Sequence, residues 1–263
     1  MLISVLNIPM FYKFSNAIVR LPSLTVINGL SEGGKTPDYE VLALEHKQYV
    51  ETLRKLDLKI HLLKKEENFP DSVFVEDPAL TFDSGAILLR LGAPSRWGEQ
   101  NLLRSQLSAI FETVLEMKEG SAEGGDILSL NDEVMIGLSK RTNEQGAREL
   151  NNLLFSLGLK SRIVDTPKGV LHFKSDCCAL DEETIFATRR LASSGVFKNY
   201  NIILTPNDEL PAANSLRVND KILIPAGYPK TADLLSKHYE VELLSIGEVA
   251  KIDAGLSCMS LRW

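Results

Sequence analysis

The segment YEVLALEHKQYVETLRKLDLKIHLL, residues 39–63, contains the pattern from which the fold can be predicted. Its first part, residues 39–56, has apolar side chains three and four residues apart, which is the spacing of an amphipathic helix. These apolar residues are Val41, Leu42, Leu44, Val50, Leu53 and Leu56. The run LKIHLL at 58–63 follows almost at once and is typical of a strand. The segment therefore predicts a helix that leads directly into a strand.

The same unit of a helix followed by a strand recurs along the chain. Further helices are expected over residues 100–114, 144–157, from about 188, and over 231–237. The β-rich runs that follow them cover residues 114–117, 161–165, 198–205 and 239–244. Rough helix starts near residues 45, 99, 144, 188 and 231 are 54, 45, 44 and 43 residues apart. Repeats of about 20–50 residues are typical of arrays and closed, propeller-like folds.

The segments between these helices contain further apolar runs, several of them paired across a turn signal. Two such turns are Leu130-Asn131-Asp132 and Val218-Asn219-Asp220. Each unit is therefore interpreted as a strand hairpin combined with a helix and its following strand. A doubly wound α/β sheet also alternates strands with helices, but the many short strands favour five α/β units. No linker divides the chain, so we expect residues 1–263 to form one domain.

The composition is that of an ordinary globular protein, with 44% hydrophobic and 24% charged residues. A net charge of -6 without a basic stripe argues against nucleic-acid binding. The sequence lacks a long uncharged apolar run and a secretory signal, so no membrane span or export is expected. Three cysteines do not make a disulfide framework, and the adjacent Cys177 and Cys178 are interpreted as structural. We therefore expect a cytoplasmic protein.

Acidic side chains crowd the apolar run PDSVFVEDPA at 70–79. If this run is a strand, its alternation places Asp71 and Asp77 on one face and Glu76 on the other. Carboxylates within an apolar strand are costly unless they are paired or bind a cation. The run therefore predicts either a cation-binding site or the solvated end of a strand.

Three further residues have side chains suited to catalysis. The glycines of EGGDIL at 123–128 permit a close backbone approach that could turn the Glu123 carboxylate into a cavity, although a hairpin turn is the alternative. His172 lies in a short β-like run, and Cys258 lies in the small-residue segment DAGLSCMSL. A histidine near a cysteine favours the nucleophilic thiolate, but a structural role for either residue is also consistent with the sequence.

Two arginines could bind a carboxylate. Arg141 precedes the third expected helix, which Thr142 or Asn143 could cap, and Arg96 lies in APSRW at 93–97. An arginine can hold a carboxylate through two parallel hydrogen bonds, but a solvated charge is the simpler interpretation of either residue. Together, the acids, the arginines and the Cys/His pair suggest a substrate with a guanidinium at one end and a carboxylate at the other.

Seven segments make the chain similar to a known family. They are PDSVFVEDPA, LGAPSR, EGGDIL, GLSKRTNEQGA, LHFKS, LPAAN and GLSCMS. By these segments the chain resembles the dimethylarginine dimethylaminohydrolases, members of the guanidine-modifying amidinotransferase superfamily. The resemblance implies a five-bladed α/β propeller of ββαβ units with the active site in its central channel. It also implies hydrolysis of Nω-methylated arginine to citrulline and a methylamine, without a cofactor.

The resemblance implies roles for individual residues. Cys258 matches the nucleophile, His172 the general acid and base, and Glu123 the carboxylate that orients the histidine and the guanidinium. The residues that match substrate contacts are Asp77 and Glu76 at the guanidinium, Asp71 at the amino-acid end, Arg96 and Arg141 at the carboxylate, and Leu24 in a lid of residues 21–35.

Other reactions on a guanidine stay open at this point. Arginine deiminases resemble this pattern but typically carry an aspartate two residues after the histidine, where this chain has Lys174. An amidinotransferase would pass the amidino group to an amine, and a catalytically silent propeller would only bind arginine-like ligands. No dedicated metal site is expected, although zinc could bind the Cys/His/acid cluster and inhibit. The expected partner is a small-molecule guanidine, and the expected assembly is a monomer or homodimer.

Overall fold

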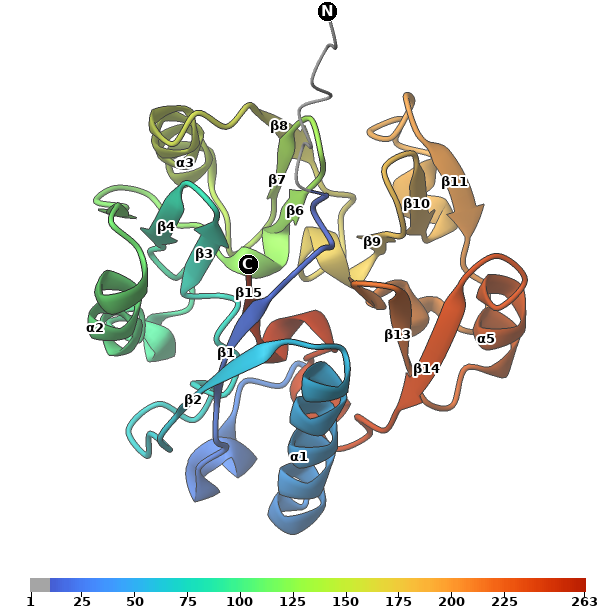
Figure 1. The fold of residues 1–263 in the computed structure, drawn as a ribbon, viewed down its shortest axis with the longest axis horizontal. Helices are drawn as coiled ribbons and strands as arrows, with labels where there is room; N and C mark the ends of the chain where they lie inside the picture. Colours follow the sequence, from blue (N-terminus) through green and yellow to red (C-terminus); the bar gives the residue numbers. More distant parts are fainter. Residues whose placement is uncertain (1–9) are drawn as a thin grey trace, which may run out of the picture.

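The computed structural model describes residues 10–263, which form five three-stranded sheets arranged in a ring (Figure 1). The first sheet joins the two ends of the chain, because β15 (Leu261–Arg262) pairs with β1 (Asn16–Arg20), which pairs in turn with β2 (Lys59–Leu63). The other sheets are β3 (Ala79–Phe82), β4 (Gly85–Leu88) and β5 (Val114–Glu116); β6 (Ile127–Ser129), β7 (Val134–Leu138) and β8 (Ser161–Asp165); β9 (Cys177–Ala179), β10 (Thr184–Ala187) and β11 (Asn201–Leu204); and β12 (Leu216–Val218), β13 (Lys221–Pro225) and β14 (Glu240–Leu244).

All five sheets share one topology. The middle strand pairs antiparallel with one neighbour and parallel with the other, as β4 does with β3 and β5. Parallel neighbours need a crossover connection, and a helix lies in each one. These helices are α1 (Tyr39–Lys55), α2 (Asn101–Ile110), α3 (Glu144–Ser156), α4 (Arg189–Ala192) and α5 (Pro229–Leu235). The predicted five-bladed α/β propeller is confirmed, and its fourth helix is the shortest.

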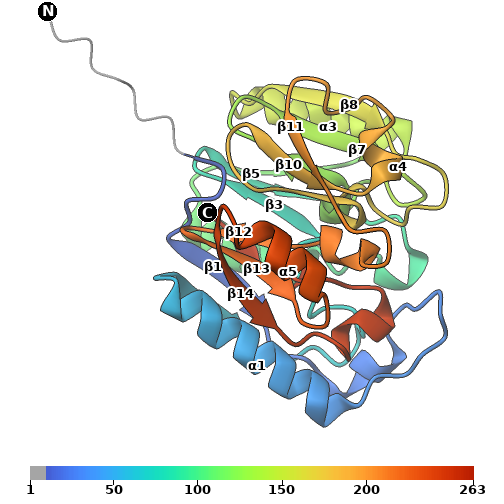
Figure 2. The same cartoon turned by 90° about the vertical axis from the view of Figure 1, so that its right-hand side faces the viewer.

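The helices lie outside the sheets, as the two ribbon views show (Figures 1 and 2). In α3 the buried side chains include Leu150 and Leu154, which join the core cluster between the second and third sheets. The helix begins where Asn143 accepts a hydrogen bond from the Gly146 amide at 2.8 Å. One of the two caps predicted for this helix is therefore present, and it fixes the loop that contains Arg141.

Two predicted strands are wrong. Residues 70–78 form turns, and the strand starts only at Ala79. Proline restricts the chain at both ends of this segment, and the Phe74 amide donates to the Asp71 carbonyl at 2.9 Å, which closes a turn. Asp71, Glu76 and Asp77 are consequently all buried instead of lying on opposite faces of a strand.

His172 likewise does not lie in a strand. It immediately precedes a short 3-10 helix, η4 (Phe173–Ser175), and its backbone carbonyl accepts from the Ser175 amide at 3.0 Å. The apolar run around it is short, and its neighbour Phe173 packs in the core beside Phe197. The burial of Phe173 therefore explains the apolar pattern without a strand.

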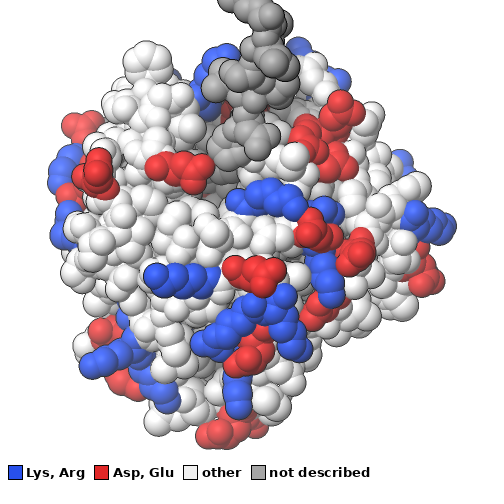
Figure 3. All heavy atoms as spheres, viewed as in Figure 1, with Lys and Arg blue, Asp and Glu red and all other residues white. Residues whose placement is uncertain are grey.

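Residues 10–263 include no helix long and apolar enough to cross a membrane. On the face shown in Figure 3, acidic and basic side chains are intermixed, so this face has no broad basic patch of the kind that binds nucleic-acid phosphates.

Candidate active site

Three residues distant in sequence are brought together by short 3-10 helices. Glu123 precedes η3 (Gly124–Asp126), His172 precedes η4, and Cys258 lies within η7 (Ser257–Met259). The helix η3 contacts both η4 and η7. Residues predicted from separate motifs, about 50 and 86 positions apart in the chain, therefore face one region of the fold.

Acidic groups surround the His172 ring. One ligand atom from each of Asp77, Glu123 and His172 lies within 4.8 Å of the other two. The Nε2 atom of His172 is 3.5 Å from Glu123 Oε2, and its Nδ1 atom is 3.2 Å from Asp126 Oδ2. Two carboxylates and an imidazole this close can enclose one small cation, either a metal ion or a planar guanidinium. Zinc binding here stays a prediction.

The two glycines of EGGD make this close packing possible. A Cβ atom on Gly124 would lie 2.0 Å from the Glu76 carbonyl oxygen, and one on Gly125 would lie 2.8 Å from Cγ of His172. Side chains do not approach backbone or ring atoms so closely. The backbone of η3 therefore lies directly against the histidine, which is a close approach of the kind that the two glycines permit.

Cys258 lies beside the acids of the turn segment. Its carbonyl accepts a hydrogen bond from the Glu76 amide at 3.2 Å, and its Sγ atom accepts one from the Gly255 amide at 3.5 Å. Burial, followed by the charges of Asp77 and Glu76, raises the pKa of the Cys258 thiol to about 12, although the Gly255 amide and Lys174 act in the opposite direction. Without a bound cation, the residue is a thiol at neutral pH.

The pKa of His172 is shifted in the same direction. Burial lowers the pKa, but Asp126, Asp77 and Glu123 outweigh burial and raise it to about 9. The imidazole is therefore protonated at neutral pH. It can give a proton to a leaving group, which is the first role expected of a general acid and base.

Arg96 is buried and contacts the acids of the protein itself. Its Nη1 atom lies 2.6 Å from Asp77 Oδ2, while Nε and Nη2 donate to the two oxygens of Glu99 at 2.9 and 2.7 Å. Its Nη2 atom also donates to the carbonyls of Asp71 and Phe74. In this structure, therefore, Arg96 orders the turn that contains Asp77, and its contact with a substrate carboxylate stays a prediction.

Arg141 is the more accessible of the two arginines. Its side chain is 19% exposed, and Nη1 donates to both oxygens of Glu123, at 3.2 and 3.3 Å. It therefore lies at the same cluster as His172, with a side chain that is partly exposed.

Asp71 and Leu24 belong to the region predicted as a lid. Asp71 Oδ1 accepts a hydrogen bond from the Leu30 amide at 3.0 Å, which ties the segment after η1 (Leu24–Asn28) to the turn that contains the acids. Leu24 begins η1 and is 59% exposed, so the structure does not bring it into the cluster.

Several residues at the site were missed at the sequence level. Lys174 Nζ lies 2.6 Å from Glu76 Oε1, and Arg262 Nη2 lies 2.9 Å from the same oxygen. Asn214 accepts from the Ser257 amide at 3.3 Å and donates to the Lys174 carbonyl at 2.9 Å. These contacts join residues far apart in the chain, so the sequence gives no local signal for them. The ion pair between Arg96 and Glu99 was also missed, although the spacing of three residues is a local signal for it.

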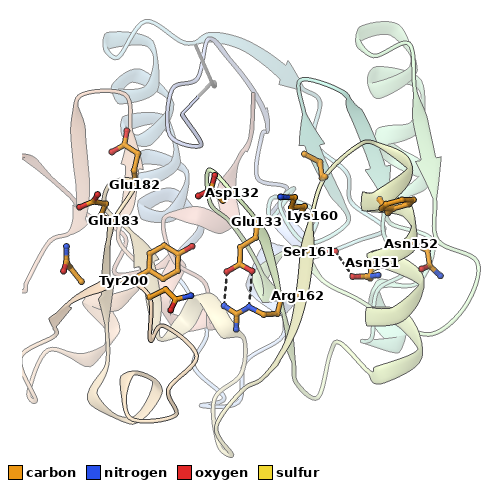
Figure 4. Close-up of a pocket in the computed structure, with 14 residues that line it drawn as sticks. Asp132, Glu133, Asn151, Asn152, Lys160, Ser161, Arg162, Glu182, Glu183 and Tyr200 are labelled. Atoms are coloured by element: carbon orange, nitrogen blue, oxygen red, sulfur yellow. Dashed lines mark hydrogen bonds and ion pairs between the residues drawn. The ribbon is translucent and has the colours of Figure 1, made fainter. Parts of the chain in front are cut away.

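Two hollows are present whose lining includes none of Asp77, Glu123, His172 and Cys258. A cavity of about 470 Å³ is lined by Glu76, Lys174 and Arg262 together with apolar side chains from several sheets. A wider surface hollow of about 1040 Å³ lies between the third and fourth sheets, where Glu133 and Arg162 form an ion pair (Figure 4). The residues that line this hollow do not include the predicted site residues.

The ring of five sheets and the cluster of Asp77, Glu123 and His172, with Cys258 beside the acids, define an α/β propeller of the guanidine-modifying class. The model of the eukaryotic N,N dimethylarginine dimethylhydrolase family matches residues 37–180. The chain is 38% identical over 255 residues to the N(G),N(G)-dimethylarginine dimethylaminohydrolase of Pseudomonas aeruginosa, with 95% of this chain and 100% of that protein covered. This chain therefore belongs to the dimethylarginine dimethylaminohydrolase family.

Solved structures agree with this assignment. The Pseudomonas aeruginosa enzyme, as a cysteine-to-serine mutant complexed with citrulline, matches with a TM-score of 0.93 and 37% identity, covering 96% of this chain and 100% of that chain. A histidine-to-glycine dimethylarginine dimethylaminohydrolase, present as an adduct with S-methyl-L-thiocitrulline, matches with a TM-score of 0.92. A cyanobacterial arginine dihydrolase domain, 17% identical with a TM-score of 0.84, shares the fold alone.

Proposed function

We propose that this protein hydrolyses Nω-methylated arginine, as asymmetric dimethylarginine or monomethylarginine, to L-citrulline and dimethylamine or methylamine. The observation that carries the proposal is the placement of Asp77, Glu123 and His172 within 4.8 Å of one another, beside Cys258, in a chain of this family. A binding protein for arginine-like ligands would need the carboxylates but not the nucleophile.

Substrate binding supplies a positive charge next to the Cys258 sulfur. The charges of Asp77 and Glu76 raise the pKa of Cys258, in addition to the larger effect of burial. A guanidinium held against these acids neutralises them and adds a positive charge next to the sulfur, and both effects favour the thiolate. The thiol then gives up its proton to solvent, so the nucleophile forms chiefly when the substrate is present.

The reaction follows in two displacements. The Cys258 thiolate attacks the guanidinium carbon and forms a C–S bond. The protonated His172 gives its Nε2 proton to the methylated nitrogen, whose C–N bond breaks and releases the amine. A water molecule then attacks the thiouronium carbon while neutral His172 accepts its proton. The C–S bond breaks and its electron pair returns to sulfur. The hydroxyl of the adduct gives its remaining proton to that sulfur as the carbonyl of citrulline forms, so the Cys258 thiol is restored and citrulline leaves.

The remaining side chains position the substrate in this proposal. Asp77 and Glu76 hold the guanidinium plane, and Glu123 orients both that plane and His172. Asp71 accepts from the α-amino group. Once the substrate has entered, Arg141 and Arg96 bind its α-carboxylate. Leu24, in the lid, covers the bound substrate. The reactive cysteine must stay reduced, which fits a cytoplasmic enzyme. Every assigned residue comes from one chain, so either a monomer or a homodimer is compatible with the proposal.

Citrulline release from asymmetric dimethylarginine, monomethylarginine and arginine, measured in parallel, tests the proposal. We expect citrulline from the methylated substrates and none from the Cys258→Ser variant. Citrulline chiefly from arginine would assign the protein to the deiminases instead. If no substrate yields citrulline, hydrolysis is refuted, and amidino transfer to added amines decides between a transferase and a silent binder.

A further inference from the structure

Asp126 is wholly buried at the end of η3, and its carboxylate contacts both the ring of His172 and the backbone amide of Phe173. Its Oδ1 atom accepts a hydrogen bond from the Phe173 amide at 2.9 Å, and Oδ2 accepts one from each of the Ser139 and Thr142 hydroxyls at 2.7 Å. The same Oδ2 atom lies 3.2 Å from Nδ1 of His172. These contacts fix the carboxylate against both the backbone that follows His172 and its ring.

The contact with Nδ1 selects one form of the ring. A carboxylate oxygen accepts hydrogen bonds but does not donate them, so Nδ1 must carry the hydrogen in this contact. The neutral imidazole is then the Nδ1–H tautomer, and its Nε2 atom is left able to accept a proton. A catalytic histidine that alternates between acid and base needs such a fixed tautomer.

Glu123, the carboxylate expected to orient His172, has other contacts as well. Its Oε1 atom accepts from the Gly92 amide at 2.9 Å, and both of its oxygens accept from Arg141. Glu123 lies 3.5 Å from Nε2 of His172, on the side of the ring opposite Asp126. Glu123 thus faces the nitrogen that exchanges the proton, whereas Asp126 faces the nitrogen that keeps its proton.

We propose that Asp126 is the positioning residue of His172: it holds the ring as the Nδ1–H tautomer, so that Nε2 carries every proton exchanged with the substrate and with water. In the first displacement Nε2 loses its proton to the leaving amine, and in the second it regains one from water. Nδ1 keeps its hydrogen bond to Asp126 throughout. The inference rests on the proposed function and adds to it a residue that does not touch the substrate.

The tautomer can be read in the wild-type protein. We would label its histidines with ¹⁵N, record NMR spectra near pH 10, where His172 is mostly neutral because its pKa is about 9, and assign the ring by its loss in His172→Gln. A protonated Nδ1 and an unprotonated Nε2 are expected. The opposite pattern, with the hydrogen on Nε2, would overturn the proposal.

Kinetics supply the second readout. In Asp126→Asn the amide can donate to Nδ1 and reverse the tautomer, so we expect kcat to fall about 10²- to 10⁴-fold with KM changed less than about threefold. The matched control is Ser139→Ala, which removes one donor to the same carboxylate and leaves the ring contact, and its kcat should fall less than about threefold. A kcat for Asp126→Asn within threefold of wild type contradicts the proposal. If this variant does not fold, the NMR measurement decides.

The inference and the proposed function can fail separately. A wild-type protein that yields no citrulline refutes hydrolysis, while the NMR spectrum still tests whether Asp126 sets the tautomer. Normal turnover with the hydrogen on Nε2 refutes the role of Asp126 alone.

Discussion

The Asp77 carboxylate lies 2.6 Å from the buried Arg96 guanidinium, so the main acid proposed for the substrate cation is already paired with a cation of the protein. Burial raises the pKa of Asp77, but Arg96, His172 and the Gly125 amide together outweigh burial and keep the pKa below its usual value. Its second oxygen accepts from the Gly125 amide at 3.1 Å. Asp77 is therefore ionised and fixed before the substrate arrives.

Replacing Arg96 tests how much the fold depends on this pairing. Arg96→Met removes the charge but keeps most of the volume, and it leaves Asp77 and Glu99 as unpaired buried acids. Breaking a buried pair from one side costs about 3–5 kcal/mol, so urea unfolding should show a loss of that order. Arg96→Lys keeps the charge without the fork of five donors and should lose less. A stability within about 1 kcal/mol of wild type for Arg96→Met would show that the acids find other partners.

The thiol chemistry of Cys258 makes a second prediction. With a pKa of about 12, the free protein holds far less thiolate at neutral pH than an ordinary cysteine, whose pKa is about 8.5. The thiolate of a high-pKa thiol is intrinsically more nucleophilic, so the net alkylation rate by iodoacetamide near pH 7.5 should be roughly 10- to 100-fold slower than for a free thiol. The rate should keep rising above pH 9, where an ordinary cysteine reaches its plateau. Cys258→Ser provides the background, and a plateau below pH 9 would contradict the prediction.

The repeating part of the fold could be predicted from the sequence because its signals are local. Helical spacing over residues 39–56 and the β-rich run that follows depend on neighbours in the chain, and the same holds for the cap at Asn143. The segment 70–78 could not be placed, because its acids are buried against Arg96, Lys174 and Arg262, which lie far along the chain or outside any repeat. Without knowledge of these basic partners, an apolar run interrupted by acids has the pattern of a strand.

The candidate site divides in the same way. The motifs supplied Cys258, His172 and Glu123, and the fold places them together. Spacing alone does not show which of two carboxylates in EGGD faces which nitrogen of the histidine, since this depends on the loop that contains Ser139 and on η4. Asp126 therefore emerges only from the three-dimensional arrangement.

The glycines of η3 separate the effects of catalysis and folding. In Gly125→Ala the new methyl would lie 2.8 Å from the His172 ring, so the ring must move, and misplacement of about 1 Å can cost about 10² in rate. We expect kcat to fall by that order while the melting temperature changes little. In Gly124→Ala the methyl meets the Glu76 carbonyl at 2.0 Å, which backbone cannot relieve cheaply, and the melting temperature should fall as well. Melting temperature and kcat would be measured for both variants. A larger fall in melting temperature for Gly125→Ala than for Gly124→Ala would contradict the prediction.

His46, on α1, predicts a sensitivity to acid that is unrelated to catalysis. The side chain is buried, its Nε2 atom lacks a partner among residues 10–263, and burial lowers its pKa to about 4. Below about pH 6.5 the unfolded chain binds a proton at this residue that the folded protein does not bind until about pH 4, so stability falls as the pH falls through this window. The shift corresponds to about 3 kcal/mol.

His46→Leu removes this titration and keeps an apolar side chain of similar size. Chemical unfolding at pH 7 and pH 4 should show that the variant loses about 3 kcal/mol less than wild type between the two conditions. The difference between the two proteins cancels the titration of the other groups. Equal losses would show that His46 can be protonated in the folded protein with little cost.

Asp71 links the proposed lid to the proposed amino-acid contact, and one substitution separates these roles. Its Oδ1 atom accepts from the Leu30 amide at 3.0 Å, and an asparagine carbonyl can still accept that hydrogen bond. Asp71→Asn therefore preserves the tie to the segment after η1 but removes the charge that would attract a substrate ammonium. Because hydrogen bonds to charged groups contribute about 1.5–3 kcal/mol, KM should rise about 10- to 100-fold, with kcat nearly unchanged.

The control for this variant is a change of substrate. A methylated guanidino acid without the α-amino group cannot use the charge of Asp71, so wild type and Asp71→Asn should have similar KM values for it. If Asp71 instead acts mainly through the lid, the variant should behave like wild type with both substrates, because the hydrogen bond from Leu30 is kept. A fall in kcat with both substrates would contradict both assignments, since it would require that the Asp71 charge act on the cluster around Asp77, through the Arg96 that lies between them.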